Sequence, residues 1–158
     1  MSQDLWFEDF TVGRRFETRG VTLSESQILD FALQWDPQPF HIDVEASESW
    51  GYGGLIASGF HTLCAAFRMV VQARIFTAAS LGSPGMDKLR WMRPVRPGDT
   101  IRTELEVLDA RASQSKPDRG IVTMLYRVFN QRREEVMRLE TVQILRRKPA
   151  EGSSVSSV

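Results

Sequence analysis

A long apolar segment between residues 59 and 77 constrains the fold of this chain more than any other feature. Beyond its first turn, charged or amide side chains interrupt it only at Arg68, Gln72 and Arg74. Its other side chains include Leu63, Cys64, Ala65, Ala66, Phe67, Met69, Val70 and Val71. This pattern predicts a helix from about Gly59 to Thr77. A helix that is apolar on most sides must be largely wrapped by other structure.

A shorter helix is predicted before this segment, from about Glu25 to Trp35. Ser24 and Gln27 have the spacing of a capping box at its start. Apolar side chains then recur at helical spacing, at Ile28, Phe31, Ala32 and Trp35. A first strand is expected over residues 15–21 and a short helix over residues 43–50.

The second half of the chain has the alternation of strands. Ile101, Thr103, Leu105 and Val107 alternate with charged residues, which is typical of a half-exposed strand. Further strands are predicted near 89–92, 122–128 and 136–145, with hairpin turns at 114–119 and 130–135. The fold class is therefore α+β, with an antiparallel sheet against one buried helix. The free face or edge of such a sheet needs cover, so a homodimer or larger assembly is expected.

Composition narrows the class of protein further. The 158 residues suit a single domain, predicted over 1–148, followed by a disordered tail over 149–158. The formal net charge is zero, which does not favour a nucleic-acid partner. The single cysteine, Cys64, excludes an internal disulfide and a cysteine-based zinc site, and it is interpreted as a buried small hydrophobe. No segment resembles a signal peptide or a membrane span, so the cytoplasm is the expected location.

The segment Asp36-Pro37-Gln38-Pro39-Phe40-His41 places a carboxylate and one of only two histidines five residues apart. Each proline fixes its own φ and keeps the preceding residue out of the α region, so Asp36 should end a helix. A carboxylate and an imidazole on one stiff loop suit the binding and deprotonation of a water molecule. Spacing alone favours a plainer alternative, because Asp-Pro turns are common and His41 could cap neighbouring structure.

With two further motifs, this segment resembles the MaoC-like dehydratases, also called hydratase-2 or (R)-specific enoyl-CoA hydratases. It is similar to the family signature Asp-x-Asn-Pro-x-His. Ala57-Ser58-Gly59-Phe60 resembles the segment that opens the family's central helix, and residues 93–100 resemble its Pro-Val-x-x-Gly-Asp turn. The likeness extends from about residue 8 to 147. It implies a hotdog fold, in which a curved antiparallel sheet wraps a long central helix.

The resemblance implies a hydro-lyase that reversibly adds water to a trans-2-enoyl thioester, giving a 3-hydroxyacyl thioester. The carrier would be CoA or acyl carrier protein, and no cofactor and no metal is expected. Asp36 and His41 would hold the water, with the role of each left open because a coupled pair titrates as a unit. The backbone N–H of Gly59 would bind the thioester oxyanion, as the exposed N–H groups of a helix start allow. The plainer alternative is that Gly59 only starts the helix.

Other positions are expected to serve the substrate. Gln38 replaces the asparagine of the family signature and is one methylene longer, so its hydrogen bond near the dyad should be relocated. Gly54 and Ile56 are expected to line the acyl entrance. Ser58 is a candidate substrate ligand, although the helix N-cap is its simpler role. Trp35 stands where many members have glycine, which predicts a bulky ring beside the site.

Three alternatives remain at the level of sequence. His61 is interpreted as a hydrogen-bonded core histidine and not as a catalytic group. A hotdog thioesterase would act on the same kind of substrate, but several such groups carry a carboxylate on the central helix, and no Asp or Glu occurs from Ser49 to Met86. A non-catalytic hotdog module that binds acyl groups or dimerises is the other rival, made less attractive by the presence of both Asp36 and His41.

Overall fold

The computed structural model describes residues 4–150 of the chain. It contains an antiparallel sheet in the order β1-β4-β5-β6-β3, with β2 also paired to β4. The strands are β1 (Arg15–Glu17), β2 (Val21–Thr22), β3 (Gly85–Trp91), β4 (Thr100–Ala112), β5 (Arg119–Phe129) and β6 (Glu135–Arg146). The helices are the 3-10 turn η1 (Phe7–Asp9), α1 (Glu25–Trp35), α2 (Pro39–Ile42), α3 (Val44–Ser49) and α4 (Gly59–Gln72).

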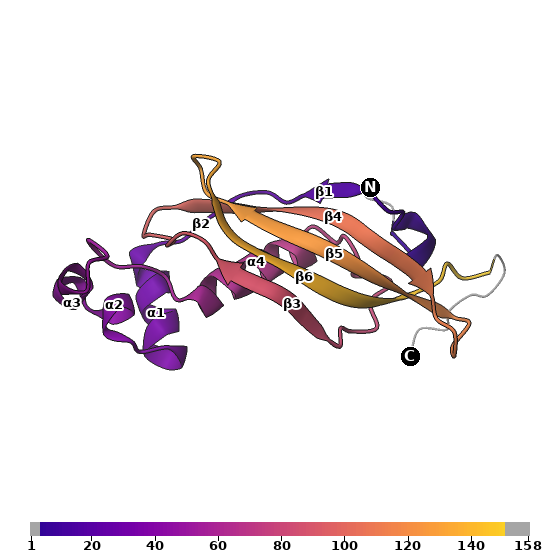
Figure 1. The fold of residues 1–158 in the computed structure, drawn as a ribbon, viewed down its shortest axis with the longest axis horizontal. Coiled ribbons are helices and arrows are strands. Elements are labelled where there is room, and N and C mark those ends of the chain that lie inside the picture. The colour runs from indigo at the N-terminus through magenta and orange to yellow at the C-terminus, as the bar shows by residue number, and fades with distance from the viewer. Residues whose placement is uncertain (1–3, 151–158) are drawn as a thin grey trace.

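The sheet lies along α4, while α1, α2 and α3 gather at one end of the molecule (Figure 1). The core forms where the buried residues of β4, β5 and β6 meet the buried side of α4, which includes Ala66, Met69 and Val70. The predicted α+β arrangement of an antiparallel sheet against a long helix is confirmed. No helix within residues 4–150 is both long and apolar enough to cross a membrane.

The capping-box sequence predicts the start of α1 correctly. Ser24 Oγ accepts a hydrogen bond from Gln27 N–H at 3.2 Å, and the Gln27 side chain accepts one from Ser24 N–H at 2.9 Å. This reciprocal pair satisfies two N–H groups that a helix start would leave without partners. The short helix predicted over residues 43–50 is also present as α3.

Helix α4 is shorter than predicted, because it ends at Gln72 and not at Thr77. Arg74 has a φ of +56°, a left-handed conformation that stops the helical turn. The chain then continues through buried Ile75 and Phe76 outside the helix.

The prediction that α4 is wrapped on most sides is wrong for the single chain. Phe60, Phe67 and Val71 are exposed, and so is the thiol-bearing Cys64, which was expected to be buried. These four residues recur at intervals of three and four, so they form one stripe along α4. The exposed stripe is apolar. The prediction fails because the sheet covers only the opposite side of the helix.

The sheet has a β-bulge in its edge strand β3. Asp87 is opposite Glu140, but Arg90 is opposite Arg138, so two residues of β3 face one of β6. Lys88 adopts a φ of +53° within the bulge. One extra residue reverses the side-chain alternation that follows it. The predicted disorder of the tail falls mostly on residues 151–158, which lie outside the described residues.

Candidate active site

A cavity of about 380 Å³ opens between α2, the start of α4 and the end of β3. It brings together Asp36 and His41 with Gly59, although these residues come from two separate segments of the chain. Its other walls are mainly aromatic and apolar, and include Phe40, Tyr52, Ile56, Phe60, Trp91 and Val95. The sequence motifs therefore converge on one hollow.

His41 is held rigidly at the edge of this cavity. Pro39 begins the single turn of α2, where its missing N–H costs nothing. His41 is 5% exposed, and its Nδ1 lies 2.7 Å from the carbonyl oxygen of Ile56. Since a carbonyl can only accept, Nδ1 carries the proton. The other ring nitrogen, Nε2, therefore carries a lone pair in the neutral ring, and it faces Asp36.

Asp36 lies at the end of α1, where its backbone N–H still bonds to Ala32. Its Oδ2 is 3.3 Å from His41 Nε2 and accepts a hydrogen bond from Ser58 Oγ at 2.6 Å. Its Oδ1 accepts one from Gln38 Nε2 at 2.8 Å. Burial acts to raise the pKa of Asp36, but the bonds from Ser58 and Gln38 and the nearby His41 outweigh it, so the pKa lies below its ordinary value.

Gly59 is the first residue of α4 and lines the same cavity. Ser58 caps the helix by accepting from Phe60 N–H at 3.2 Å, which confirms its N-cap role. Within residues 4–150, the N–H of Gly59 has no hydrogen-bond partner. A Cβ atom at position 59 would lie 2.5 Å from the ring of Trp91, so the helix-entry explanation for this glycine also has a steric basis.

Of the remaining predicted residues, two line the cavity and two do not. Gln38 and Ile56 line the cavity, and Gln38 Nε2 donates a hydrogen bond to Asp36 Oδ1 of the dyad. Ser58 is fully buried behind Asp36. The prediction for Gly54 is wrong, because it does not line the cavity and its carbonyl instead accepts hydrogen bonds from Ser47 and Arg96.

Two predictions about nearby rings are corrected. Trp35 does not lie beside the dyad: it is 68% exposed and lines a separate apolar hollow with Phe31, Phe60 and Cys64. His61 is stacked on Phe31 at a centroid distance of 4.7 Å, and its buried Nδ1 has no hydrogen-bond partner within residues 4–150. Burial lowers the pKa of His61.

Sequence reasoning missed most of the aromatic wall. Phe40 packs edge-on against His41 at 4.6 Å and contacts Tyr52 at 5.2 Å. Phe40 lies inside the recognised motif, so its position could have been anticipated. Tyr52 and Trp91 have no such local signal, because a glycine-rich loop and an edge strand carry them to the cavity.

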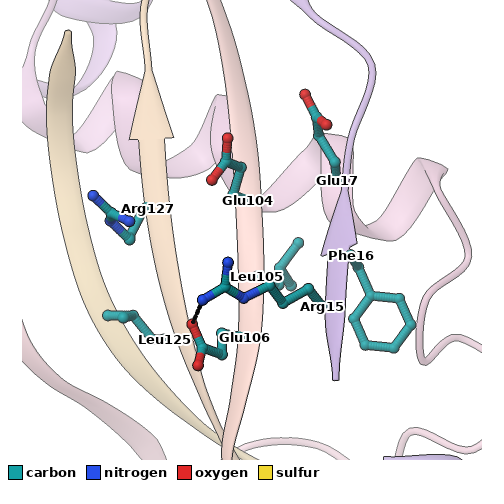
Figure 2. Close-up of a pocket in the computed structure, with 8 residues that line it drawn as sticks. All are labelled: Arg15, Phe16, Glu17, Glu104, Leu105, Glu106, Leu125 and Arg127. Atoms are coloured by element: carbon teal, nitrogen blue, oxygen red, sulfur yellow. Dashed lines mark ion pairs between the residues drawn. The ribbon is translucent and has the colours of Figure 1, made fainter. Parts of the chain in front are cut away.

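A second hollow lies on the face of the sheet away from α4 and serves as a contrast (Figure 2). Its polar groups come from β1, β4 and β5, and Arg15 pairs with Glu106 at 3.0 Å. Arg15 is 76% exposed, so this pair is screened by solvent. None of the predicted site residues lies there. Opposite charges paired across neighbouring strands stabilise a solvated sheet face and need no ligand.

The arrangement at Asp36 and His41 is chemically different. His41 Nε2 and Asp36 Oδ2 lie 3.3 Å apart beside an open cavity, so a water molecule in contact with both could be oriented by the carboxylate and deprotonated by a neutral imidazole. The start of α4 supplies an unpaired N–H and partial positive charge at the same cavity, which suit an oxyanion. Within residues 4–150, no cluster of His, Cys, Asp and Glu could hold a metal ion.

Comparison with known proteins gives a consistent result. The family model for a MaoC-like domain matches residues 8–126. YdeM from Bacillus subtilis, described as uncharacterised, is 30% identical over 140 residues, which are 89% of this chain and 98% of that protein. A crystal structure of a MaoC-like dehydratase from Rhodospirillum rubrum is 38% identical with a TM-score of 0.87, over 92% of this chain and 99% of that one.

Two more distant structures bear on the fold. The unliganded (R)-hydratase PhaJ1 from Pseudomonas aeruginosa is 26% identical with a TM-score of 0.64, over 98% of this chain and 96% of that one. A Mycobacterium tuberculosis protein described as having a double hotdog fold gives a TM-score of 0.75 at 22% identity, over 95% of this chain and 46% of that one. The predicted hotdog fold is confirmed.

Proposed function

The chain belongs to the MaoC-like domain family, and we propose that it is a hydro-lyase that adds water reversibly to a trans-2-enoyl thioester. The observation that carries this proposal is the 3.3 Å approach of His41 Nε2 to Asp36 Oδ2 at the cavity, with His41 Nδ1 tied to Ile56. An (R)-hydratase of the same fold supports the reaction class. The proposal allows either CoA or acyl carrier protein as the carrier of the acyl group. The acyl chain would occupy the aromatic-walled cavity.

The proposed reaction needs one water molecule and one oxyanion site. The water oxygen bonds to the β-carbon and gives one proton to His41. The electron pair of the C=C bond shifts to join the α-carbon and the carbonyl carbon, and the π pair of the C=O bond moves to the thioester oxygen, which gives an enolate. A proton then returns to the α-carbon as the enolate collapses, so the elements of water are added in balance. Positioned acid–base groups contribute about 10²–10⁴-fold to such steps.

We propose a separate role for each of the two groups, based on its surroundings. Asp36 is ionised, because its pKa lies below the ordinary value, and an ionised carboxylate can only accept hydrogen bonds. It would orient the water. His41 Nε2 would take the water proton and return it to the α-carbon, since Nδ1 is already occupied by the Ile56 carbonyl. Gly59 N–H would stabilise the enolate oxygen.

The direct test is to mix the purified protein with trans-2-enoyl-CoA substrates of different chain length and branching. Hydration removes the absorbance of the conjugated thioester, while a thiol reagent detects released CoA. We expect loss of absorbance without thiol release. Thiol release without hydration would instead support a thioesterase, and binding without turnover would support the non-catalytic module.

We propose further that a second copy of this chain covers the exposed stripe of α4, formed by Phe60, Cys64, Phe67 and Val71. The double hotdog fold of the Mycobacterium tuberculosis neighbour supports this, because two such units occur there in one chain. Sedimentation should show a dimer that Phe67→Asp dissociates. The matched control is Val12→Asp, at an exposed apolar residue outside α4, which should leave the dimer intact. Cytoplasmic placement and independence from cofactors remain predictions from the sequence.

A further inference from the structure

Trp91 faces the start of α4 because of the bulge in β3. Before the bulge, Asp87 shares the solvent face of the sheet with its partner on β6. Regular alternation would put Trp91 on that same face, four residues later. The extra residue of the bulge instead pairs Trp91 with Met137, which is fully buried on the inner face. A local irregularity therefore turns an indole ring toward Gly59.

The contact between Trp91 and Gly59 is polar as well as steric. Trp91 Nε1 donates a hydrogen bond to the carbonyl oxygen of Gly59 at 2.9 Å. The same ring occupies the space that any side chain at position 59 would need. Phe60 packs edge-on against the indole at 5.8 Å, and all three residues line the cavity.

This hydrogen bond completes the support of the peptide that joins Gly59 to Phe60. The carbonyl end is held by Trp91, and the N–H end donates to Ser58 Oγ at 3.2 Å. Ser58 Oγ in turn donates to Asp36 at 2.6 Å. A continuous series of hydrogen bonds thus connects the edge strand, the start of α4 and the dyad.

We infer that Trp91 is a positioning residue, which holds the first peptide of α4 so that Gly59 N–H keeps its place at the cavity. This inference rests on the proposed hydration activity. Glycine has the greatest backbone freedom of any residue, and helix ends fray, so Gly59 would otherwise move. An oxyanion donor is effective when its position is fixed before the reaction begins. Trp91 supplies that restraint from outside the helix.

The test compares Trp91→Phe with wild type. Phenylalanine keeps an aromatic ring against Gly59 but removes the indole donor. We expect kcat for enoyl-CoA hydration to fall about three- to tenfold, because one neutral hydrogen bond makes a modest net contribution. KM should stay within about twofold, because the loss concerns a donor that acts mainly on the enolate. Trp6→Phe, at a tryptophan outside the cavity, is the matched control and should leave both constants unchanged.

A second variant tests the indole N–H of Trp91 while nearly keeping the shape of the ring. Replacing the indole of Trp91 with benzothiophene, by incorporating the corresponding amino acid, removes only the N–H. It should reproduce the loss in kcat with an unchanged unfolding temperature, even if Trp91→Phe folds poorly. A benzothiophene variant with wild-type kcat would overturn the inference while leaving the hydratase proposal standing. Absence of hydration in the wild-type protein would overturn both.

Discussion

Two loops of this protein each present an aspartate that accepts two good hydrogen bonds, yet we expect different roles for them. Asp36 accepts from Ser58 and Gln38 beside the cavity. Asp99, in the turn before β4, accepts from Arg96 N–H at 2.9 Å and from Gln131 Nε2 at 2.7 Å. Both side chains are largely buried. Burial and hydrogen-bond number therefore do not distinguish a site from a structural element.

The difference lies in the third neighbour of each carboxylate. Asp36 faces His41 Nε2 at a cavity, whereas Asp99 faces a surface guanidinium, Arg132, at 4.0 Å. An imidazole can exchange a proton at neutral pH, but a guanidinium cannot. Asp99 joins the turn to the hairpin between β5 and β6, so it should contribute to folding, while Asp36 should contribute to chemistry.

The largest expected effect is on catalysis at the first loop. Asp36→Asn and His41→Ala should each lower the rate of enoyl-CoA hydration by about 10²–10⁴-fold, because each removes one acid–base group. Circular dichroism and the unfolding temperature should show a folded protein in both cases. Turnover at the wild-type rate in either folded variant would remove the basis for assigning this loop to the active site.

The opposite result is expected at the second loop. Asp99→Asn should destabilise the protein by about 1–3 kcal/mol, because bonds to a buried charged acceptor are weakened and the added amide donor lacks a partner. Denaturant titration measures the change, and kcat per folded molecule should stay near the wild-type value. A loss of kcat comparable with that of Asp36→Asn would erase the distinction between the loops.

Gly59→Ala should destabilise the protein at the start of α4. The new Cβ would lie 2.5 Å from Trp91, so the ring must shift, at a cost of about 1–3 kcal/mol. Thermal unfolding should detect the loss, and Gly59→Ala should cost less in a Trp91→Leu background, where the clashing ring is absent. If the single variant is as stable as wild type, the ring has more freedom than the packing indicates.

The smallest effect is the pH dependence of stability that Asp36 contributes. Burial opposes ionisation, but bonds from Ser58 and Gln38 lower the pKa of Asp36 in the folded protein below its ordinary value of 3.8. Its ionised form therefore stabilises the fold fully above about pH 3.8, and this contribution is lost as the pH falls through the folded pKa. The difference in unfolding free energy between wild type and Asp36→Asn should shrink below about pH 3.8. A difference that does not change with pH would contradict this assignment.

The sequence predicts the elements that carry repeated local signals. The capping pair of Ser24 and Gln27 defines the start of α1, and the alternation from Ile101 to Val107 identifies β4. It does not predict α2, because a four-residue helix that begins at Pro39 is too short to show periodicity. It also misses the end of α4, since Arg74 adopts a left-handed conformation without the glycine or asparagine that usually marks one.

The candidate site is predicted only in part for a similar reason. Asp36, His41 and Gly59 belong to recognisable motifs, so their convergence could be expected. Trp91 depends on a bulge at Lys88, and nothing in the local sequence marks that bulge. Residues that reach a site through an irregular strand become visible only when the register of the whole sheet is known.

The central claim is that Asp36 and His41 act together on one water molecule. The most direct test is the hydration rate of the double variant Asp36→Asn/His41→Ala beside the two single variants. The claim predicts a double variant about as slow as the slower single variant, because groups that act as a unit are lost together. Losses that multiply in the double variant would show two independent contributions and contradict the claim.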